Sequence, residues 1–351
     1  MTGRNRVVTG ETPTMYANTR LWFGTLALGT LALGTLGGCT LDKKDDGADE
    51  FREAVPQSES VALSGPDAKG STSTAAAGPS RRTLATGSPL PYAKWYGFTR
   101  EMRGGVNHVT ADVLIGVWAI IHTVPTSVSK DSATWGPWTE ALDPASYRFR
   151  IERVGVDEYD YVLEGRNKRS TADADFRAVL SGHGYGKLRP EHGQGKFTID
   201  LDVAKALDPF KHEDDSGSVT ITHALPHDFS ENLDALPRTI TAVVTPAGEA
   251  HYSVESVAKV DHTGSIHVDA HVDIDDSKTT KLEDVVIDSR WAATGAGRAD
   301  IDIAGGDLPV GIPMVSAVEC WGTDYQQSYY TDSANFAPTT GAVTACVYDS
   351  E

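Results

Sequence analysis

The sequence predicts an α+β fold that is mostly β, in which a long antiparallel meander forms a curved sheet or half-barrel wrapped around an N-terminal apolar helix. Two patterns support this prediction. Apolar residues recur at steps of three and four over residues 92–123, and after about residue 146 the apolar period changes to two. Strand and helix patterns do not alternate along the sequence, as they would for a parallel sheet.

The first 38 residues have the pattern of a secretory signal peptide. Three Arg residues precede an uncharged run rich in Leu, Ala and Gly over residues 21–36, and two glycines separate this run from Cys39. A positive segment, an apolar core and small residues at the cleavage point are the parts of such a signal. The run is too short and too rich in glycine for a membrane span, which needs about 20 apolar residues.

The sequence Leu36-Gly37-Gly38-Cys39 resembles the lipobox of bacterial lipoproteins. In that family the cysteine thiol receives a diacylglyceryl group, and cleavage directly precedes the cysteine. The resemblance implies that lipidated Cys39 anchors the protein to a membrane of the cell envelope on its extracytoplasmic side. Thr40 in place of Asp resembles lipoproteins that a Gram-negative cell forwards to its outer membrane. The alternative is ordinary secretion with a chance cysteine.

The cysteine count supports export. The chain has three cysteines, and lipidation of the first leaves Cys320 and Cys346 as an even pair. In an oxidising compartment this pair is expected to form a disulfide, which would stabilise the fold by roughly 3 kcal/mol. Two buried free thiols are the alternative.

Composition divides the rest of the chain into a tether and one domain. Residues 39–90 are poor in large apolar side chains, which predicts a flexible tether, with a short docked turn over residues 51–56. Residues 91–351 are expected to form a single β-rich domain.

Removal of residues 1–38 takes away three Arg and one Glu, which changes the net charge from −18 to −20. This charge opposes binding to nucleic acid and to anionic lipid surfaces.

The helical pattern over residues 92–123 opens the domain. Pro125 ends the pattern, and Gly104-Gly105 predicts either a kink or two shorter helices. The stretch 113–121, which includes Trp118 and Ile121, is apolar on all sides. In a soluble protein such a stretch is expected to be enclosed by other structure.

Ten to twelve alternating runs follow, and the clearest of them covers residues 266–275. Ile and Val alternate there with His267, Asp269 and His271, so the polar side chains share one face of a strand. Imidazole and carboxylate groups suit zinc, which makes this stripe a weak metal candidate. The alternative is an ordinary solvent-facing strand.

A curved sheet around a helix is similar to lipoprotein carriers of the half-barrel type and, more loosely, to lipocalins.

The sequence contains no motif of a P-loop, a G-x-S-x-G elbow or an H-E-x-x-H helix, so we predict no cofactor and no catalytic residue. Trp135-Gly136-Pro137-Trp138 is expected to form an amphipathic turn after the helix. Together with Trp118 and Ile121, its tryptophans are the candidate contacts for a ligand or partner. The alternative is that they plug one end of the sheet.

The chain resembles uncharacterised lipoproteins of large-genome Gram-negative bacteria. The resemblance lies in Cys39, residues 51–56, Trp135 to Trp138, residues 159–165, and Glu319-Cys320-Trp321 with the second cysteine. It implies one exported domain and the disulfide, and it transfers no catalytic residue.

The leading functional hypothesis is therefore a non-enzymatic, membrane-anchored lipoprotein that binds an apolar small molecule or a partner protein. An apolar ligand would require an internal cavity beside residues 113–121. One alternative is a structural or adhesive envelope protein without a small ligand. The other is a hydrolase that uses a metal or dispersed carboxylates.

Overall fold

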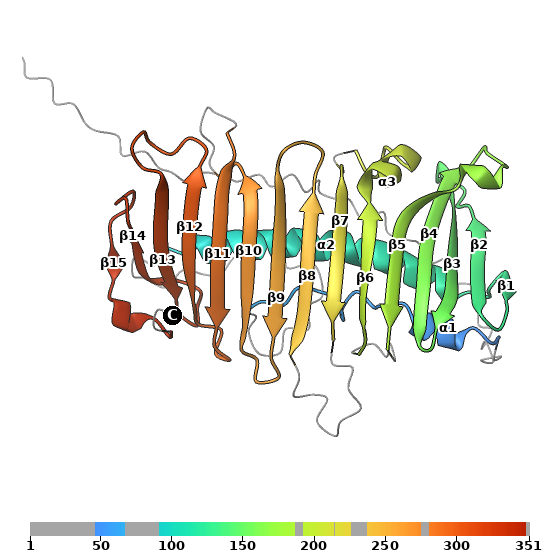
Figure 1. The fold of residues 1–351 in the computed structure, drawn as a ribbon, viewed down its shortest axis with the longest axis horizontal. Coiled ribbons are helices and arrows are strands. Elements are labelled where there is room, and N and C mark those ends of the chain that lie inside the picture. The colour runs from blue at the N-terminus through green and yellow to red at the C-terminus, as the bar shows by residue number, and fades with distance from the viewer. Residues whose placement is uncertain are drawn as a thin grey trace, which may run out of the picture.

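A computed structural model describes residues 46–66, 91–186, 192–213, 215–225, 237–274 and 281–348. Within these ranges, fifteen strands form one antiparallel meander in which each strand pairs with its neighbours in the sequence. The sheet does not close, and a long helix lies across one of its faces (Figure 1). The predicted fold class is confirmed. The predicted signal peptide and Cys39 lie outside the described residues.

The helices of the described chain are α1 (Asp49–Glu53), α2 (Lys94–Ile121) and α3 (Leu201–Leu207), with 3-10 turns at Asp173–Asp175 and Val343–Ala345. The first strands are β1 (Ser127–Val128), β2 (Ser132–Trp138), β3 (Ala145–Gly155), β4 (Glu158–Asn167) and β5 (Arg177–Tyr185). The middle strands are β6 (Gln194–Asp200), β7 (Ser218–Ala224), β8 (Arg238–Thr245), β9 (His251–Ala258) and β10 (Gly264–Val272). The last strands are β11 (Glu283–Trp291), β12 (Gly297–Gly305), β13 (Met314–Trp321), β14 (Gln327–Asp332) and β15 (Thr340–Gly341).

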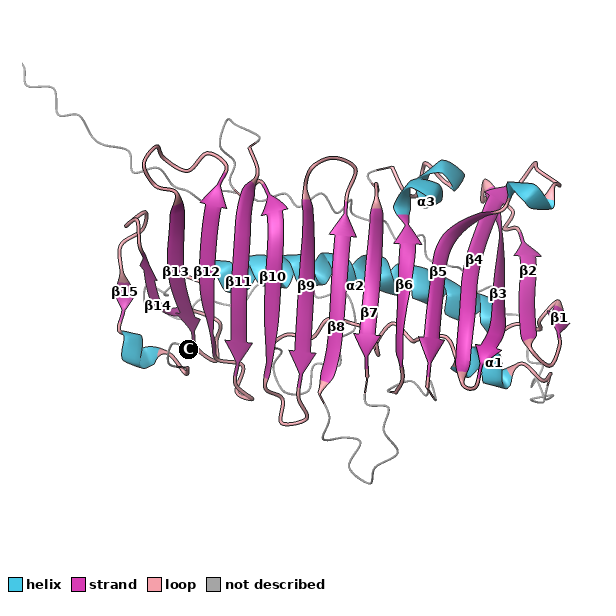
Figure 2. Cartoon of the chain, in the orientation of Figure 1, coloured by secondary structure: helices cyan, strands magenta, loops and turns pink. Residues whose placement is uncertain are grey.

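Helix α2 runs across the strands and spans most of the width of the sheet (Figure 2). Its 28 residues give a length of about 42 Å. It agrees with the predicted helix 92–123 to within two residues at each end. The helix continues through Gly104-Gly105, so it is not divided into two shorter helices there. Side chains such as Met102, Val106 and Val117 face the sheet and are buried.

Residues 113–121 were predicted to be enclosed on all sides, but this is wrong because the outer face of α2 is exposed. Leu114, Val117 and Ile121 are buried against the core, whereas Ile115 is 52% exposed and Trp118 is 50% exposed. The sheet therefore covers one side of the helix only. An apolar composition identifies a helix that needs partners, but it does not say how many of its faces the domain itself covers.

Residues 46–66 form a second layer element beside α2, which corrects the prediction of a flexible tether for this part of the chain. Phe51 is buried, and its ring meets the edge of Tyr159 on β4 at 6.1 Å. Farther along, the side-chain amide of Asn107 on α2 bonds to both the N–H and the carbonyl of Leu63, at 2.8 and 3.0 Å. The segment thus runs along the helix from the β4 side towards β9. The docked turn expected at residues 51–56 lies within it.

A buried carboxylate fixes the N-terminus of α2. Glu319 on β13 is fully buried, and it accepts hydrogen bonds from the backbone N–H groups of Lys94, Trp95 and Tyr96 at 2.7, 2.8 and 3.1 Å. The first N–H groups of a helix have no partner within the helix, and the helix dipole favours negative charge at this end. A strand 225 residues away in the sequence therefore supplies the cap.

Glycines paired with aromatic residues shape the inner face of the sheet. In five cross-strand pairs, an aromatic or imidazole ring lies over the glycine that is its register partner, which leaves room above the sheet for α2 and residues 46–66. These pairs are Tyr147–Gly165, Tyr161–Gly182, His223–Gly195, Trp291–Gly264 and Trp321–Gly297. At Gly264, an added methyl group would lie 2.3 Å from the Trp291 ring and 2.5 Å from the Val257 carbonyl oxygen.

The predicted disulfide is confirmed. Cys320 at the end of β13 and Cys346 near the C-terminus are joined, with their Cα atoms 5.4 Å apart. The bond holds the last turn against a strand that also carries Glu319.

We predict opposite effects for two glycine substitutions. Gly264→Ala should lower the free energy of unfolding by about 1–3 kcal/mol, because the methyl group displaces Trp291 or the strand. Gly97→Ala is the control: this glycine lies in α2 with open space at its Cβ, so alanine should raise stability by about 0.5–1 kcal/mol. Denaturant unfolding measures both. Equal effects at the two positions would contradict the packing argument.

We also predict a pH dependence that involves Glu319. Burial raises the pKa of Glu319 to about 7, against the opposing hydrogen bonds from the three N–H groups, whereas the unfolded carboxyl titrates near 4.5. The folded pKa is the higher one, so this group's contribution to stability is complete below about pH 4.5 and is lost as the pH rises through 7.

The measurement is the stability difference between the wild type and Glu319→Gln at pH 5 and pH 8, which cancels the other titrating groups. The wild-type advantage should shrink by about 2–3 kcal/mol between these pH values. Glu255→Gln, at an exposed position on β9, is the control and should show no such change. A pH-independent difference for Glu319→Gln would refute the assignment.

Candidate functional site

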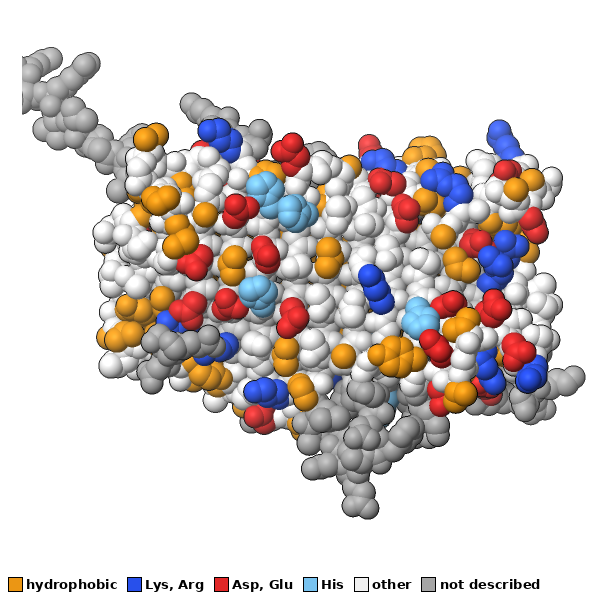
Figure 3. Space-filling view, viewed as in Figure 1, with side chains coloured by type: hydrophobic (Ala, Val, Ile, Leu, Met, Phe, Trp, Pro, Cys, Tyr) orange, Lys and Arg blue, Asp and Glu red, His pale blue; other side chains and the backbone are white. Residues whose placement is uncertain are grey.

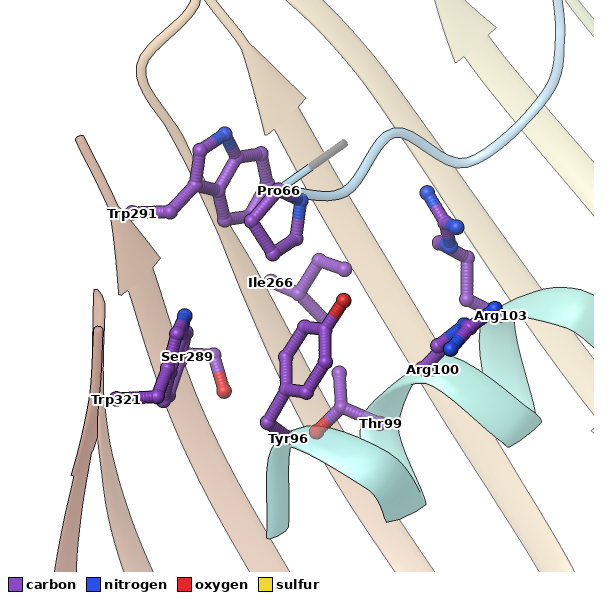
Figure 4. Close-up of a pocket in the computed structure, with 9 residues that line it drawn as sticks. All are labelled: Pro66, Tyr96, Thr99, Arg100, Arg103, Ile266, Ser289, Trp291 and Trp321. Carbon is purple, nitrogen blue, oxygen red and sulfur yellow. The ribbon is translucent and has the colours of Figure 1, made fainter. Parts of the chain in front are cut away.

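Two cavities inside the described domain are small. At the N-terminal end of α2, a cavity of about 10 Å³ lies between Tyr96, Ile266 and Trp321 (Figure 4). A second cavity of about 30 Å³ lies beside Trp95 and Ile303. A single water molecule needs about 10–15 Å³, so neither cavity can hold a lipid chain or a drug-sized molecule. Beside residues 113–121, where an apolar cavity was expected, the described residues form a pocket of about 120 Å³, which is too small for a drug-sized ligand.

A polar hollow of about 700 Å³ lies on the opposite, outward face of the sheet over β2 to β6. Alternate residues of a strand point to the same face, so the lining follows the register of the five strands. One cross-strand row consists of Thr134, Arg150, Val162, Ser181 and Thr198. The adjacent row consists of Ser132, Glu152, Asp160, His183 and Lys196.

Differences in side-chain size hollow out this part of the sheet. Ser181 and Thr198 are small and lie opposite each other on β5 and β6, between the longer side chains of Arg150 and Lys196. The Thr198 hydroxyl also lies 2.9 Å from that of Thr220 on β7. Across the outward face as a whole, acidic, basic and polar groups are interspersed (Figure 3). The floor of the hollow therefore offers hydroxyl groups, and charged groups stand around it.

Charged groups around the hollow are held by neighbours on adjacent strands. Nδ1 of His183 lies 2.6 Å from a carboxylate oxygen of Asp160, and Nε2 lies 3.2 Å from Glu158. On the other side, the guanidinium groups of Arg148 and Arg150 both bond to Glu164, at 3.0 and 2.9 Å. These contacts fix the orientations of the imidazole and of the guanidinium groups. The hollow therefore carries hydroxyl groups and charged groups of both signs, several of them paired with one another.

The sequence-based interpretation missed this site. Asp160 lies 23 residues from His183 in the sequence and is brought opposite it only by the β4–β5 register. The alternation along each strand identified the outward face, yet the register between strands depends on turn lengths and bulges. No local signal could have found the hollow.

The four-residue tryptophan motif does not form a turn. It is the end of β2, with a cis peptide bond between Gly136 and Pro137 and a shift of register against β3. Trp135 is fully buried (0% exposed), and its indole N–H donates to the carbonyl of Thr123 at 3.2 Å. Trp138 is 40% exposed. The alternative interpretation, a plug at one end of the sheet, agrees with the burial of Trp135.

Two other candidate contact residues do come together. Trp118 and Ile121 line a pocket of about 120 Å³ between the last turns of α2 and residues 52–57. Ile121 is buried, whereas the Trp118 ring stacks on His122 with ring centroids 4.0 Å apart. Trp135 and Trp138 are not among the residues that line this pocket.

The metal candidate resolves into separate ion pairs. His267 lies 2.7 Å from Asp288, and His271 lies 2.7 Å from Asp284, both across the β10–β11 register. Asp269 lies between them in the sequence and faces Val286 across the same register. In the described part of the chain, no group of three or more His, Cys, Asp or Glu side chains is placed to hold a metal ion. The weak metal prediction therefore has no structural support there.

One buried histidine belongs to the core. His223 on β7 faces inward against Phe197, with ring centroids 6.4 Å apart, and burial lowers its pKa to about 4. It is therefore neutral at pH 7. It lies on the face opposite to the polar hollow and takes no part in the site.

Comparisons with known proteins give no relatives from which to transfer a function: no family model, curated protein or solved structure matches this chain.

We predict that the two tryptophans of the β2 motif differ in their effect on stability. Trp135→Ala should lower the free energy of unfolding by about 3–5 kcal/mol, because it empties a fully buried site and removes the hydrogen bond to Thr123. Trp138→Ala should cost much less, since that ring is partly solvated in the native state. Thermal and denaturant unfolding test this. A large loss at Trp138 with little at Trp135 would reverse the assignment.

Proposed function

We propose that this chain is an exported lipoprotein, anchored to a membrane through acylated Cys39, which binds a partner protein of the cell envelope in the polar hollow over β2 to β6. The proposal is for a binding protein without catalytic activity. The observation that carries it is the contrast between the small cavities inside the domain and the broad polar hollow on the open face of the sheet.

The character of the hollow favours a protein surface over an apolar molecule. Its lining combines hydroxyl groups with both signs of charge, and these groups are oriented by contacts such as His183–Asp160 and Arg150–Glu164. Preset donors and acceptors reduce the entropy lost on binding. The hollow is also broad, because it extends over five strands, which suits a convex loop or helix of a partner. An apolar ligand has no comparable site among the described residues.

The two alternative functions have less support. A metal-dependent hydrolase would need a cluster of ligands, and the described His and Asp side chains of β10 and β11 form separate pairs instead. An adhesive surface built on the tryptophan motif would need both rings at the surface, and Trp135 is in the core.

The test fills the hollow without disturbing the core. Ser181→Trp places a large ring at its floor, on an exposed outward position of β5. The control is Thr241→Trp, which lies on the same face of the sheet on β8, outside the hollow; its neighbours Ile240 and Ala242 are the residues that face inward. Both variants should unfold at the wild-type denaturant concentration.

Envelope fractions passed over the immobilised proteins should yield a partner with the wild type and with Thr241→Trp, and at least tenfold less of it with Ser181→Trp. If Ser181→Trp retains the same partner at wild-type yield, binding occurs elsewhere and the hollow is not the site. Mass spectrometry of Cys39 in the natural host tests the anchor separately.

A further inference from the structure

The outer face of the last two turns of α2 is apolar and uncovered by the described chain. Ile115 and Trp118 are each about half exposed on the last two turns, and Val124 is largely exposed just after the helix. Trp118 also borders the pocket formed with residues 52–57. A tryptophan presents a large apolar ring with a polar N–H edge, which suits the boundary between water and an apolar phase. This group of three side chains is called the end patch below.

The described chain begins beside the end patch. The Asp46 carboxylate binds the Arg52 guanidinium at 2.6 Å, and Arg52 in turn donates to the carbonyls of Ile121 at 2.6 Å and Thr123 at 3.1 Å. The Arg52 side chain is mostly buried, so this junction is held firmly against the C-terminus of α2. Val128 on the edge strand β1 lies next to Gly47. The segment 46–52 therefore starts at the same end of the domain as the end patch.

The length of chain between Cys39 and Asp46 limits the distance between the membrane and the domain. Cys39 precedes Asp46 by seven residues. A fully extended chain of this length spans at most about 25 Å, which is less than the length of α2. If Cys39 is acylated, the bilayer surface therefore lies within about 25 Å of Asp46.

We propose that the end patch rests on the lipid bilayer, with Trp118, Ile115 and Val124 in contact with the boundary between head groups and acyl chains. This inference rests on the proposed lipid anchor, and it assigns to α2 the role of orienting the domain. The hollow over β2 to β6 is on the opposite face of the sheet from α2, so this orientation turns the hollow away from the membrane.

The local charges are compatible with a lipid surface. Among the acidic side chains of residues 46–50, Asp46 and Asp49 are paired with Arg52, and Glu50 is paired with Arg153. Glu53 remains at the rim of the pocket beside His122. The contact area is small, so the apolar contact alone would be weak. A short link holds the patch at a high effective concentration near the bilayer, which makes a weak contact sufficient.

The experiment attaches the protein to vesicles independently of natural acylation. The chain from Cys39 onward keeps every described contact, and with Cys320 and Cys346 in their disulfide, Cys39 is its one free thiol. It can be coupled to maleimide-bearing phospholipid in zwitterionic phosphatidylcholine vesicles. Tryptophan emission is then compared between vesicles with brominated acyl chains, which quench at contact, and vesicles with ordinary chains.

Wild type and Trp138→Phe should lose emission in the brominated vesicles, and Trp118→Phe should lose none. Trp138→Phe is the matched control, because Trp138 is exposed to a similar degree but lies outside the end patch. Equal quenching in Trp118→Phe, or none in the wild type, would overturn the inference. It would also be overturned if the uncoupled chain sediments as a dimer that Trp118→Ser dissociates, because a second copy would then cover the patch.

The outcome separates the inference from the proposed function. If Cys39 is acylated in the host but the coupled protein shows no contact at Trp118, the orientation is wrong and the anchor stands. If Cys39 carries no lipid, the anchor fails whatever the vesicles show.

Discussion

The position of α2 depends on one buried carboxylate. Glu319 replaces the missing hydrogen-bond partners of three backbone N–H groups at the start of the helix, and it does so from the strand that also carries the disulfide. Burying a carboxylate is costly unless its oxygens are satisfied, and here both oxygens accept hydrogen bonds. The helix anchored in this way supplies the inner layer against which residues 46–66 and the inward faces of the strands pack. Without α2, a long apolar face of the sheet would be exposed to water.

The arrangement of elements followed largely from periodicity. The step of three and four over residues 92–123 identified α2 nearly to the residue, because its inward stripe from Trp95 to Ile121 must be apolar to bury itself. The alternation in strands such as β10 identified which side chains face outward. Neither pattern specifies the register in which neighbouring strands pair. The site at Asp160 and His183 could therefore not be predicted, since it exists only through the β4–β5 register.

The expectations that failed share a cause, which is that a local motif does not specify what packs against it. A Gly-Pro pair between two tryptophans has the composition of a turn, yet β2 continues through it and puts Trp135 in the core beside Arg52. Residues 46–66 have the composition of a tether, but a few apolar side chains, Phe51 and Leu63 among them, find places beside α2. Conversely, the wholly apolar stretch of α2 is buried on only one side.

The sequential pairing of the strands links the size of the sheet to the length of the helix. Glu319 on β13 holds one end of α2 and the contact between Thr123 and Trp135 on β2 holds the other, eleven strand spacings away in the sheet order. One additional hairpin would widen the sheet by about 9.6 Å, which corresponds to about six residues of helix. Insertion or loss of a hairpin between β2 and β13 during evolution should therefore be accompanied by a matching change in α2, so that the helix acts as a molecular ruler for the number of strands.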